Sequence, residues 1–399
     1  MAEYEFWLTD DAGRRMSLLE KMAFASYTRS SIGLGTINFA VPFDPFQEKF
    51  KPYFQPDWRV EVWRSPKYGV SLRREDVFLL RKYHVYVRED GVKLLQFYGR
   101  NGMDLLYRRS VIQLPGTTYT VKTDYADDMM KEIVRQQMLY GSALDENGAA
   151  SNSRAFPQNE FLVQQDLGLG PSLTRNFEGK DVIDILKELR SATFQLNINS
   201  SSNRRIFFNV VPVNISGIST AYASTLGWEF RTFADLYGTD RTNGIVFSHE
   251  NENIETPSYS ISHLEETNYI YITNGSGASS LSSTSVQDAS RVSSSRWNRC
   301  EKIINGSASN TGTSDLQNAG YAELYNKRPV EEFPVTFLNT IGNQNTPQSL
   351  YGIDWDLGDL LRVNFAGKQF NVEVKVVYVS IDEDGKETIT GRNEVNATQ

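Results

Sequence analysis

Cysteine and histidine are scarce in this chain of 399 residues. With Cys300 as its one cysteine, the chain can form neither an internal disulfide nor a zinc site built from several cysteines. The three histidines, His84, His249 and His263, fit no HExxH, HxxxH or GxSxG pattern. The sequence therefore gives no catalytic motif, and we expect no catalytic residue, no bound metal and no cofactor.

Long apolar runs and an excess of basic residues are lacking as well. No stretch approaches the roughly 18 apolar residues that suggest a membrane span. Glu3 and Glu5 follow Met1 where a secretion signal would carry Lys or Arg. We therefore expect a protein made in a cytoplasm, with no membrane span. The net charge of −8 argues against sequence-specific nucleic-acid binding, because domains with that function are usually basic. An acidic surface can still line a passage for DNA.

The aromatic content is high, with 20 Tyr and 22 Phe, and residues 1–115 show the alternation of short strands. In the segment from Trp58 to Arg64, Trp58, Val60 and Val62 face one side and Arg59, Glu61 and Trp63 the other. Asp90-Gly91 between two strand-like runs predicts a β-hairpin. We expect this part to be a small antiparallel β-barrel.

Residues 116–330 are mixed in pattern. Helices are predicted over Ala126–Leu139, from Asp181 through Leu189, and over Leu316–Leu324, where the apolar residues recur at helical spacing. Strands are predicted over Phe194–Ile198 and Ile206–Val213. A Ser/Gly-rich stretch near 275–285 indicates a surface loop.

Residues 331–399 return to a strand pattern, with Gly367 and Asp384-Gly385 as predicted turns. The sequence thus predicts a β-rich α+β fold with two small tube-like antiparallel β-barrels and a helical, mixed domain between them. The predicted boundaries are 1–115, 116–330 and 331–399, and strands near 206–213 are a possible addition to the second barrel.

Three acids, Asp354, Asp356 and Asp359, are spaced like possible metal ligands. They lack the register of a calcium loop, which needs acids at positions 1, 3, 5 and 12 and Gly at 6. The preferred interpretation is a turn that enters a barrel strand, with the acids as polar caps.

A set of aromatic residues that we expect to be exposed allows two interpretations. They can form sugar-binding platforms, or they can anchor subunit interfaces, where Trp and Tyr dominate the binding energy. The interface interpretation is preferred. The candidate interface residues are Trp58, Trp63, Tyr68, Trp228, Tyr269 and Tyr271.

Four segments, taken in order, resemble the hub proteins of tailed-phage tips. The similarity is to the compact hubs of phages with long non-contractile tails, which are relatives of the baseplate hub of contractile phages. The segments are Trp58–Arg64, like a strand of the first barrel; Phe177–Leu189, like the helix that follows it; Ser295–Glu301, like an Arg-Glu segment of the middle region; and Tyr351–Asp359, like the opening of the second barrel.

The resemblance implies a virion protein of the tail tip that is assembled in the host cytoplasm. It implies a homotrimer whose six barrels form a ring between the hexameric tail tube, or a distal tail protein, and the trimeric tip. Fibre, spike or tape-measure proteins would be further partners, and a central channel would let DNA pass during ejection. Larger relatives carry a cell-wall hydrolase domain after the second barrel, and this chain ends soon after it, so we expect no enzyme.

Two other functions stay open. The aromatic residues and the Ser-rich loop suit a carbohydrate-binding protein that recognises the host receptor. The hypothesis of a cell-wall hydrolase rests only on the abundance of acids, 49 Asp and Glu in all.

Overall fold

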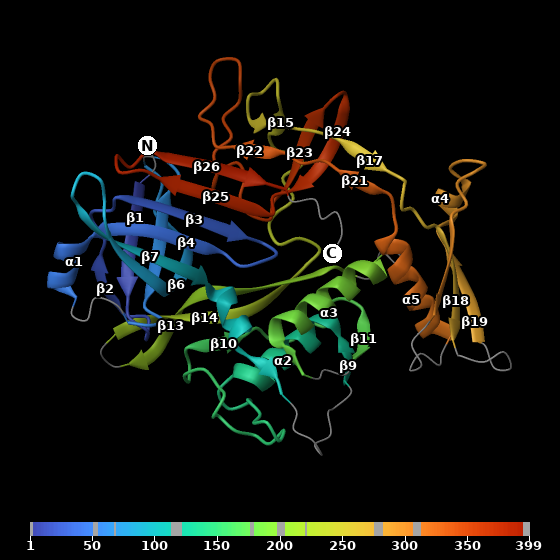
Figure 1. Ribbon diagram of the computed structural model, residues 1–399, viewed down its shortest axis with the longest axis horizontal. Coiled ribbons are helices and arrows are strands. Elements are labelled where there is room, and N and C mark those ends of the chain that lie inside the picture. Colours follow the sequence, from blue (N-terminus) through green and yellow to red (C-terminus); the bar gives the residue numbers. More distant parts are fainter. Residues whose placement is uncertain are drawn as a thin grey trace.

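The computed structural model describes residues 3–50, 55–67, 69–112, 122–175, 179–197, 204–219, 222–274, 282–305 and 313–393. Figure 1 shows three parts: a large sheet with the first and last strands of the chain, a helical layer against it, and a small module at one side.

The large sheet has eleven antiparallel strands. Their order is β16 (Ile254–Glu255), β22 (Thr336–Leu338), β26 (Glu387–Arg392), β25 (Val376–Ile381), β3 (Phe24–Ser30), β4 (Thr36–Pro42), β7 (Lys93–Asn101), β6 (Arg73–Val87), β5 (Arg59–Ser65), β1 (Glu3–Thr9) and β2 (Arg15–Leu18). The predicted β-rich α+β class is confirmed. Over the described residues the sheet is open, because no pairing joins β16 to β2.

The hairpin predicted at Asp90-Gly91 is confirmed as the turn between β6 and β7. Gly91 has a φ of +84°, a backbone conformation that favours glycine, and its amide donates to the Arg88 carbonyl at 2.9 Å. The predicted alternation of β5 is also confirmed, because Trp58, Val60 and Val62 lie together in the core.

The two ends of the chain share this sheet. β25 pairs with β3 from Val376 opposite Ser30 to Ile381 opposite Ala25, and one hydrophobic core contains Phe39 and Phe97 together with Phe337 and Trp355. The sequence suggested separate barrels because alternation shows which residues face a core. It does not show which distant strand lies alongside.

The C-terminal strands form further short sheets. One is β15 (Val246–Ser248), β23 (Leu360–Phe365) and β24 (Lys368–Glu373), and another is β17 (Ser260–Ser262) with β21 (Val330–Glu332). The short helix α1 (Phe43–Lys49) follows β4 and buries Phe46. The segment 246–255 therefore contributes β15 and β16 to the sheets that contain the C-terminal strands.

The helical layer covers the other side of β6, whose Val77 and Leu79 lie in its core, and contacts β5 through Arg59. It contains α2 (Ala126–Met138), α3 (Val182–Asn197), the 3-10 helix η1 (Gly102–Arg108), and the sheet β10 (Phe161–Val163), β14 (Tyr222–Ala234) and β13 (Ile206–Ser219). Two short pairs complete it, β11 (Ser172–Arg175) with β9 (Lys122–Tyr125), and β12 (Lys180–Asp181) with β8 (Ser110–Val111).

Both helices predicted in this layer are present, but the strand predicted over Phe194–Ile198 is wrong. Residues up to Asn197 continue α3, and Ile198 lies outside the described residues. Phe194 instead packs edge-on against Phe207 of β13 at 5.4 Å between ring centroids. Within the described residues β13 pairs with β14 and with no strand of 331–399.

The small module contains the strands β19 (Ser282–Gln287), β18 (Tyr269–Asn274) and β20 (Glu301–Asn305), with α4 (Ala289–Ser293) and α5 (Thr313–Asn326). α5 covers one face of the sheet, where Leu316 and Leu324 pack against Ile270, Ile272 and Val286. The predicted helix over Leu316–Leu324 is confirmed. Among the described residues, no helix is both long and apolar enough to cross a membrane.

Candidate functional site: a buried ionic network between the two ends of the chain

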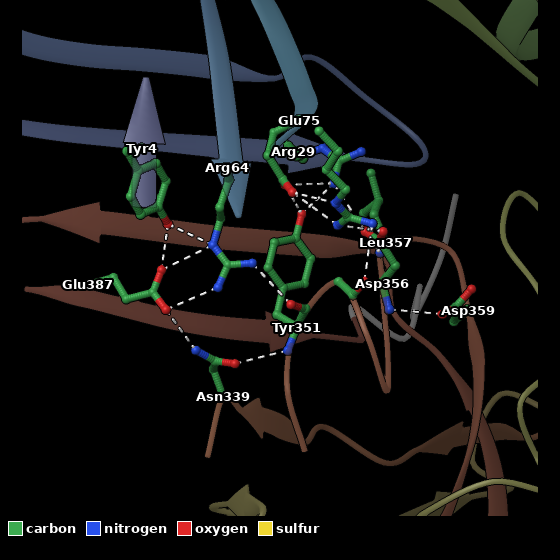
Figure 2. Close-up of polar contacts among 12 residues, drawn as sticks. Tyr4, Arg29, Arg64, Glu75, Asn339, Tyr351, Asp356, Leu357, Asp359 and Glu387 are labelled. Atoms are coloured by element: carbon green, nitrogen blue, oxygen red, sulfur yellow. Dashed lines mark hydrogen bonds and ion pairs between the residues drawn. The ribbon is translucent and has the colours of Figure 1, made fainter. Parts of the chain in front are cut away.

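Two segments that the sequence analysis singled out meet inside the molecule. Arg64, at the end of β5, donates to the carbonyl oxygen of Tyr351 at 3.0 Å, and Tyr351 opens the segment that runs to Asp359. Figure 2 shows these residues with Tyr4, Glu75 and Glu387, which come from β1, β6 and β26. The network thus connects both ends of the chain.

The alternation of the strands explains why charged side chains lie here. Arg64 follows Trp58, Val60 and Val62 on the core-facing side of β5, and its side chain is fully buried. Arg29 likewise follows Tyr27 on the core-facing side of β3. A buried charge is costly unless it is paired and hydrogen-bonded, so both arginines need acidic partners.

A β-bulge supplies one of these partners. Val62 of β5 lies opposite Asp76 of β6, but the next residue, Trp63, lies opposite Arg74. Glu75 is therefore the extra residue of the bulge, and its side chain is fully buried in the network. Bulges often redirect a side chain in this way.

Arg64 binds Glu387 and Tyr4 as well as Tyr351. Its Nε donates to Glu387 Oε2 at 3.0 Å and to the Tyr4 hydroxyl at 2.9 Å, and its Nη2 donates to Glu387 Oε1 at 3.0 Å. Burial alone would lower the pKa of Arg64, but the hydrogen bonds and charge of Glu387 outweigh it and raise that pKa above its ordinary value. Arg64 therefore stays charged at every ordinary pH.

Tyr351 connects the second pair of charges. Its hydroxyl donates to Glu75 Oε2 at 2.6 Å and accepts from Arg29, which also contacts Glu75 at 3.2 Å. Burial, with the nearby Glu75 carboxylate, raises the pKa of Tyr351 well above its usual value, so the hydroxyl stays protonated and keeps donating. The backbone amide of Tyr351 donates to Asn339 at 2.9 Å, and Asn339 also donates to Glu387.

Asp356 and Asp359 extend the network to the middle of the chain. Asp356 pairs with Arg29 at 3.1 Å and with Arg73 at 2.9 Å. Burial alone would raise the pKa of Asp356, but these two guanidinium groups hold it below its usual range. Asp359 pairs with Arg241 at 2.6 Å, so residues 240–241, which lead into β15, are attached to the same segment.

Two glycines allow the turn between Tyr351 and Asp359 to approach its neighbours. Gly352 has a φ of +85°, and a Cβ there would lie 2.6 Å from the Arg73 guanidinium. Gly358 has a φ of +83°, and a Cβ there would lie 2.5 Å from the Tyr237 ring. Each position therefore needs glycine, both for its backbone conformation and for the close contact.

The acids between Tyr351 and Asp359 accept hydrogen bonds from the protein itself. Asp354 accepts from the Leu350 amide at 2.8 Å, and Asp359 accepts from the Asp356 and Thr239 amides at 2.8 Å. No cluster of three or more His, Cys, Asp or Glu side chains suited to a metal occurs in the described ranges. The paired charges of the network hold together segments that lie far apart in the sequence.

The structure separates the predicted interface residues. Trp58 and Trp228 are 7% and 3% exposed, so the expectation that they lie on an exposed aromatic surface is wrong. Both pack in hydrophobic cores, and the Arg59 guanidinium lies over the Trp228 ring. Trp63 is half-buried between Arg15 and Arg74, and Tyr68 lies outside the described residues. Tyr269 and Tyr271 lie together on the small module and are half-buried as well.

The network residues Arg29, Glu75 and Glu387 were not identified from the sequence, and Tyr351 was noted there only as part of the segment Tyr351–Asp359. Arg64 could have been found, because a charged residue on the core-facing side of a strand must have a buried partner. The identity of that partner could not have been found, because Glu387 lies 323 positions away.

Two solved structures with a similar fold are described as tail proteins. The 43 kDa tail protein of prophage MuSo2 from Shewanella oneidensis matches with a TM-score of 0.52 and 13% identity, covering 98% of each chain. The tail protein from Neisseria meningitidis MC58 matches with a TM-score of 0.50 and 10% identity, covering 98% of this chain and 97% of that chain. At these identities the comparison shows a shared fold.

The chain belongs to the Siphovirus ReqiPepy6 Gp37-like protein family, whose model matches residues 72–391. This confirms the resemblance to proteins of tailed phages. No curated protein matches the sequence.

Proposed function

We propose that the chain is a structural hub at the tip of a phage tail, with no catalytic role of its own. Three copies form a ring that joins the hexameric tail tube, or a distal tail protein, to trimeric fibre, spike or tape-measure proteins. The ring leaves a channel for DNA. The division of the chain at 115 and 330 also belongs to this proposal, with the first and last segments as two tube-like domains whose strands share the large sheet.

The observation that carries the proposal is the connection between the two ends of the chain. They share one sheet, one core and the network around Arg64 and Tyr351. An assembly that transmits force between a tube and a tip needs subunits whose parts do not separate. Buried charge pairs suit that need, since breaking one leaves an uncompensated charge in the interior.

The family and the fold support the location. Membership of a siphovirus protein family, and the fold shared with two tail proteins, favour a place in the tail. The acidic net charge of −8 agrees with a channel through which DNA slides without binding.

The protein composition of purified particles tests this proposal. We expect the chain in isolated tails, at three copies per tail, whereas each ring of the tail tube holds six copies of the tube subunit. A particle that lacks the chain, or that holds one copy per tail, would contradict it.

A further inference from the structure

The large sheet has a hollow on the side that faces away from the core of Phe39 and Phe97. It lies over the neighbouring strands β26, β25, β3 and β4, which Figure 1 shows side by side, and encloses about 280 Å³. Its polar lining includes the uncharged side chains of Ser26, Asn38, Tyr378, Ser380, Thr388 and Thr390. We call this surface the sheet hollow.

The strand register makes the sheet hollow one continuous surface. Thr388 of β26 lies opposite Ser380 of β25, and Ser380 lies opposite Ser26 of β3. Ser26 in turn lies opposite Asn38 of β4. Residues directly opposite each other in antiparallel strands project from the same face, with their Cβ atoms about 4.5–5.5 Å apart. A single row of neighbouring polar side chains therefore crosses all four strands.

Several polar groups in the sheet hollow have no protein partner. The hydroxyls that make no hydrogen bond within the described ranges are those of Tyr378, Ser380, Thr388 and Thr390. The Asn38 Oδ1 accepts from the Gln96 side chain at 2.8 Å, which orients the amide, and its Nδ2 has no acceptor among the described residues. Donors and acceptors that converge in this way suit a ligand with several hydroxyls of its own.

Two basic side chains flank the sheet hollow on the same face. Arg392 of β26 lies over the Tyr378 ring, 5.2 Å from its centroid. Lys82 of β6 lies over the Tyr98 ring at 5.1 Å, and Tyr98 of β7 lies opposite Asn38. Neither Arg392 nor Lys82 pairs with a carboxylate of the part of the chain that the structure describes. The row of hydroxyl and amide groups therefore has a free cation at each end.

Acidic residues are rare in this part of an acidic chain. Asp and Glu make up 49 of the 399 residues, yet the five strands β26, β25, β3, β4 and β7 contain one, Glu387. Its carboxylate pairs with Arg64 in the buried network, on the other side of the sheet. A negatively charged ligand in the sheet hollow therefore meets free cations and no carboxylate of these strands.

We propose that the sheet hollow binds an acidic saccharide, a sugar chain whose units carry hydroxyls and a carboxylate or phosphate. The free hydroxyls and the Asn38 amide match the sugar hydroxyls, and Arg392 matches the acidic group. The volume of about 280 Å³ is near the lower limit of about 300 Å³ for small-ligand pockets, which suits one sugar unit at a time. Duplex DNA is a poorer match, because its binding needs many phosphate contacts at once.

Titration calorimetry of the purified chain tests this proposal, which does not rest on the proposed hub. The acidic probes are oligomers of galacturonic acid, oligomers of sialic acid and a phosphorylated mannan, so that carboxylate and phosphate are tested separately. The neutral probes are galactose oligomers and unphosphorylated mannan, and duplex DNA is a further polyanion.

Two variants remove groups of the sheet hollow. Arg392→Gln removes the cation at its rim, and Thr390→Val removes one hydroxyl while keeping a side chain that favours strands. Arg328→Gln is the matched control, because Arg328 also lies over a tyrosine ring, 3.9 Å from the Tyr325 centroid, on the small module. Urea unfolding shows that each variant is folded before it is titrated.

We expect at least one acidic probe to bind and the neutral probes to bind about tenfold more weakly or not at all. Arg392→Gln should weaken the binding about tenfold and Thr390→Val about threefold, whereas Arg328→Gln should leave it unchanged. Failure of all three acidic probes to bind, equal binding of neutral probes, or indifference to both changes would overturn the proposal. Duplex DNA binding that Arg392→Gln weakens equally would identify a nucleic-acid surface and also overturn it. The presence of the chain in tails, which tests the hub, is scored separately.

Discussion

The Arg64 guanidinium and the Glu387 carboxylate form a two-point ion pair between strands whose residues lie 323 positions apart in the sequence. The geometry is the parallel, bidentate one that lysine cannot reproduce. This pair, with the Tyr351 hydroxyl and Glu75, ties the first strands of the chain to the last.

Replacing Arg64 by Leu should destabilise the folded chain by about 3 kcal/mol, because Glu387 and the Tyr351 carbonyl would lose their buried donor. Urea unfolding measures this change. Arg64→Lys should be intermediate, since it keeps the charge and loses the second hydrogen bond. Arg88→Leu removes an ion pair at the surface and should leave the midpoint unchanged. Equal effects of the changes at 64 and 88 would contradict the role of the buried pair.

Tyr351→Phe removes one hydroxyl from the network and nothing else. Glu75 loses a 2.6 Å donor and Arg29 loses an acceptor, so the free energy of unfolding should fall by about 1–3 kcal/mol. Tyr140, which is 44% exposed, provides the matched Tyr→Phe control and should show little change. A stable Tyr351→Phe protein with the parental unfolding curve would show that the hydroxyl is dispensable.

Gly102 marks a close contact inside the helical layer, between η1 and the strands β13 and β14. A Cβ at this position would lie 2.5 Å from the Trp228 ring and 2.7 Å from the Val210 carbonyl oxygen. Gly102→Ala should therefore cost about 1–3 kcal/mol through overpacking, measured by thermal or urea unfolding. At Gly33 the nearest atom would be 3.6 Å away, and Gly33→Ala should be tolerated. Tolerance at both positions would mean that η1 packs less tightly against β13 and β14 than described.

Asp76 makes stability depend on pH with a definite sign. Burial raises the pKa of this carboxyl from 3.8 to about 6. Its folded-state pKa lies above the unfolded value, so the stability it contributes is present below pH 4 and lost as the pH rises to 6. Asp76→Asn cannot ionise. Its free energy of unfolding, relative to the parent, should therefore rise by about 2 kcal/mol between pH 4 and pH 7.

Urea unfolding of both proteins across this range measures the difference. The pH dependence is the test, since the new amide would face the Asn101 donor, now 3.4 Å from Asp76, and would add an offset that does not vary with pH. A difference that stays flat or falls between pH 4 and pH 7 would contradict the burial of an ionisable Asp76.

The sequence predicted local features well where one residue type dictates a conformation. Asp90-Gly91 defines a hairpin, and the alternation from Trp58 to Arg64 defines a strand and its two faces. The exposure of Trp58 and Trp228 was predicted wrongly, because alternation says which side of a strand a residue takes. It cannot say that the helical layer covers the second side, where Arg59 meets Trp228.

The network was beyond the reach of the sequence for the same reason. The pairing of β25 with β3 brings Glu387 near Arg64, and the bulge turns the Glu75 carboxylate inward. Both depend on contacts between distant segments. Arg64 itself was foreseeable as a buried charge, whereas its partners required the assembled sheet.

An image of the tail tip that resolves individual subunits is the most direct test of the central claim. The account predicts three copies of this chain in a ring around an open channel, between the tube and the tip proteins. Within each copy, β25 and β3 should be paired and Arg64 should contact Glu387. A tip in which the chain is a single copy, or lies outside the ring around the channel, would contradict the account.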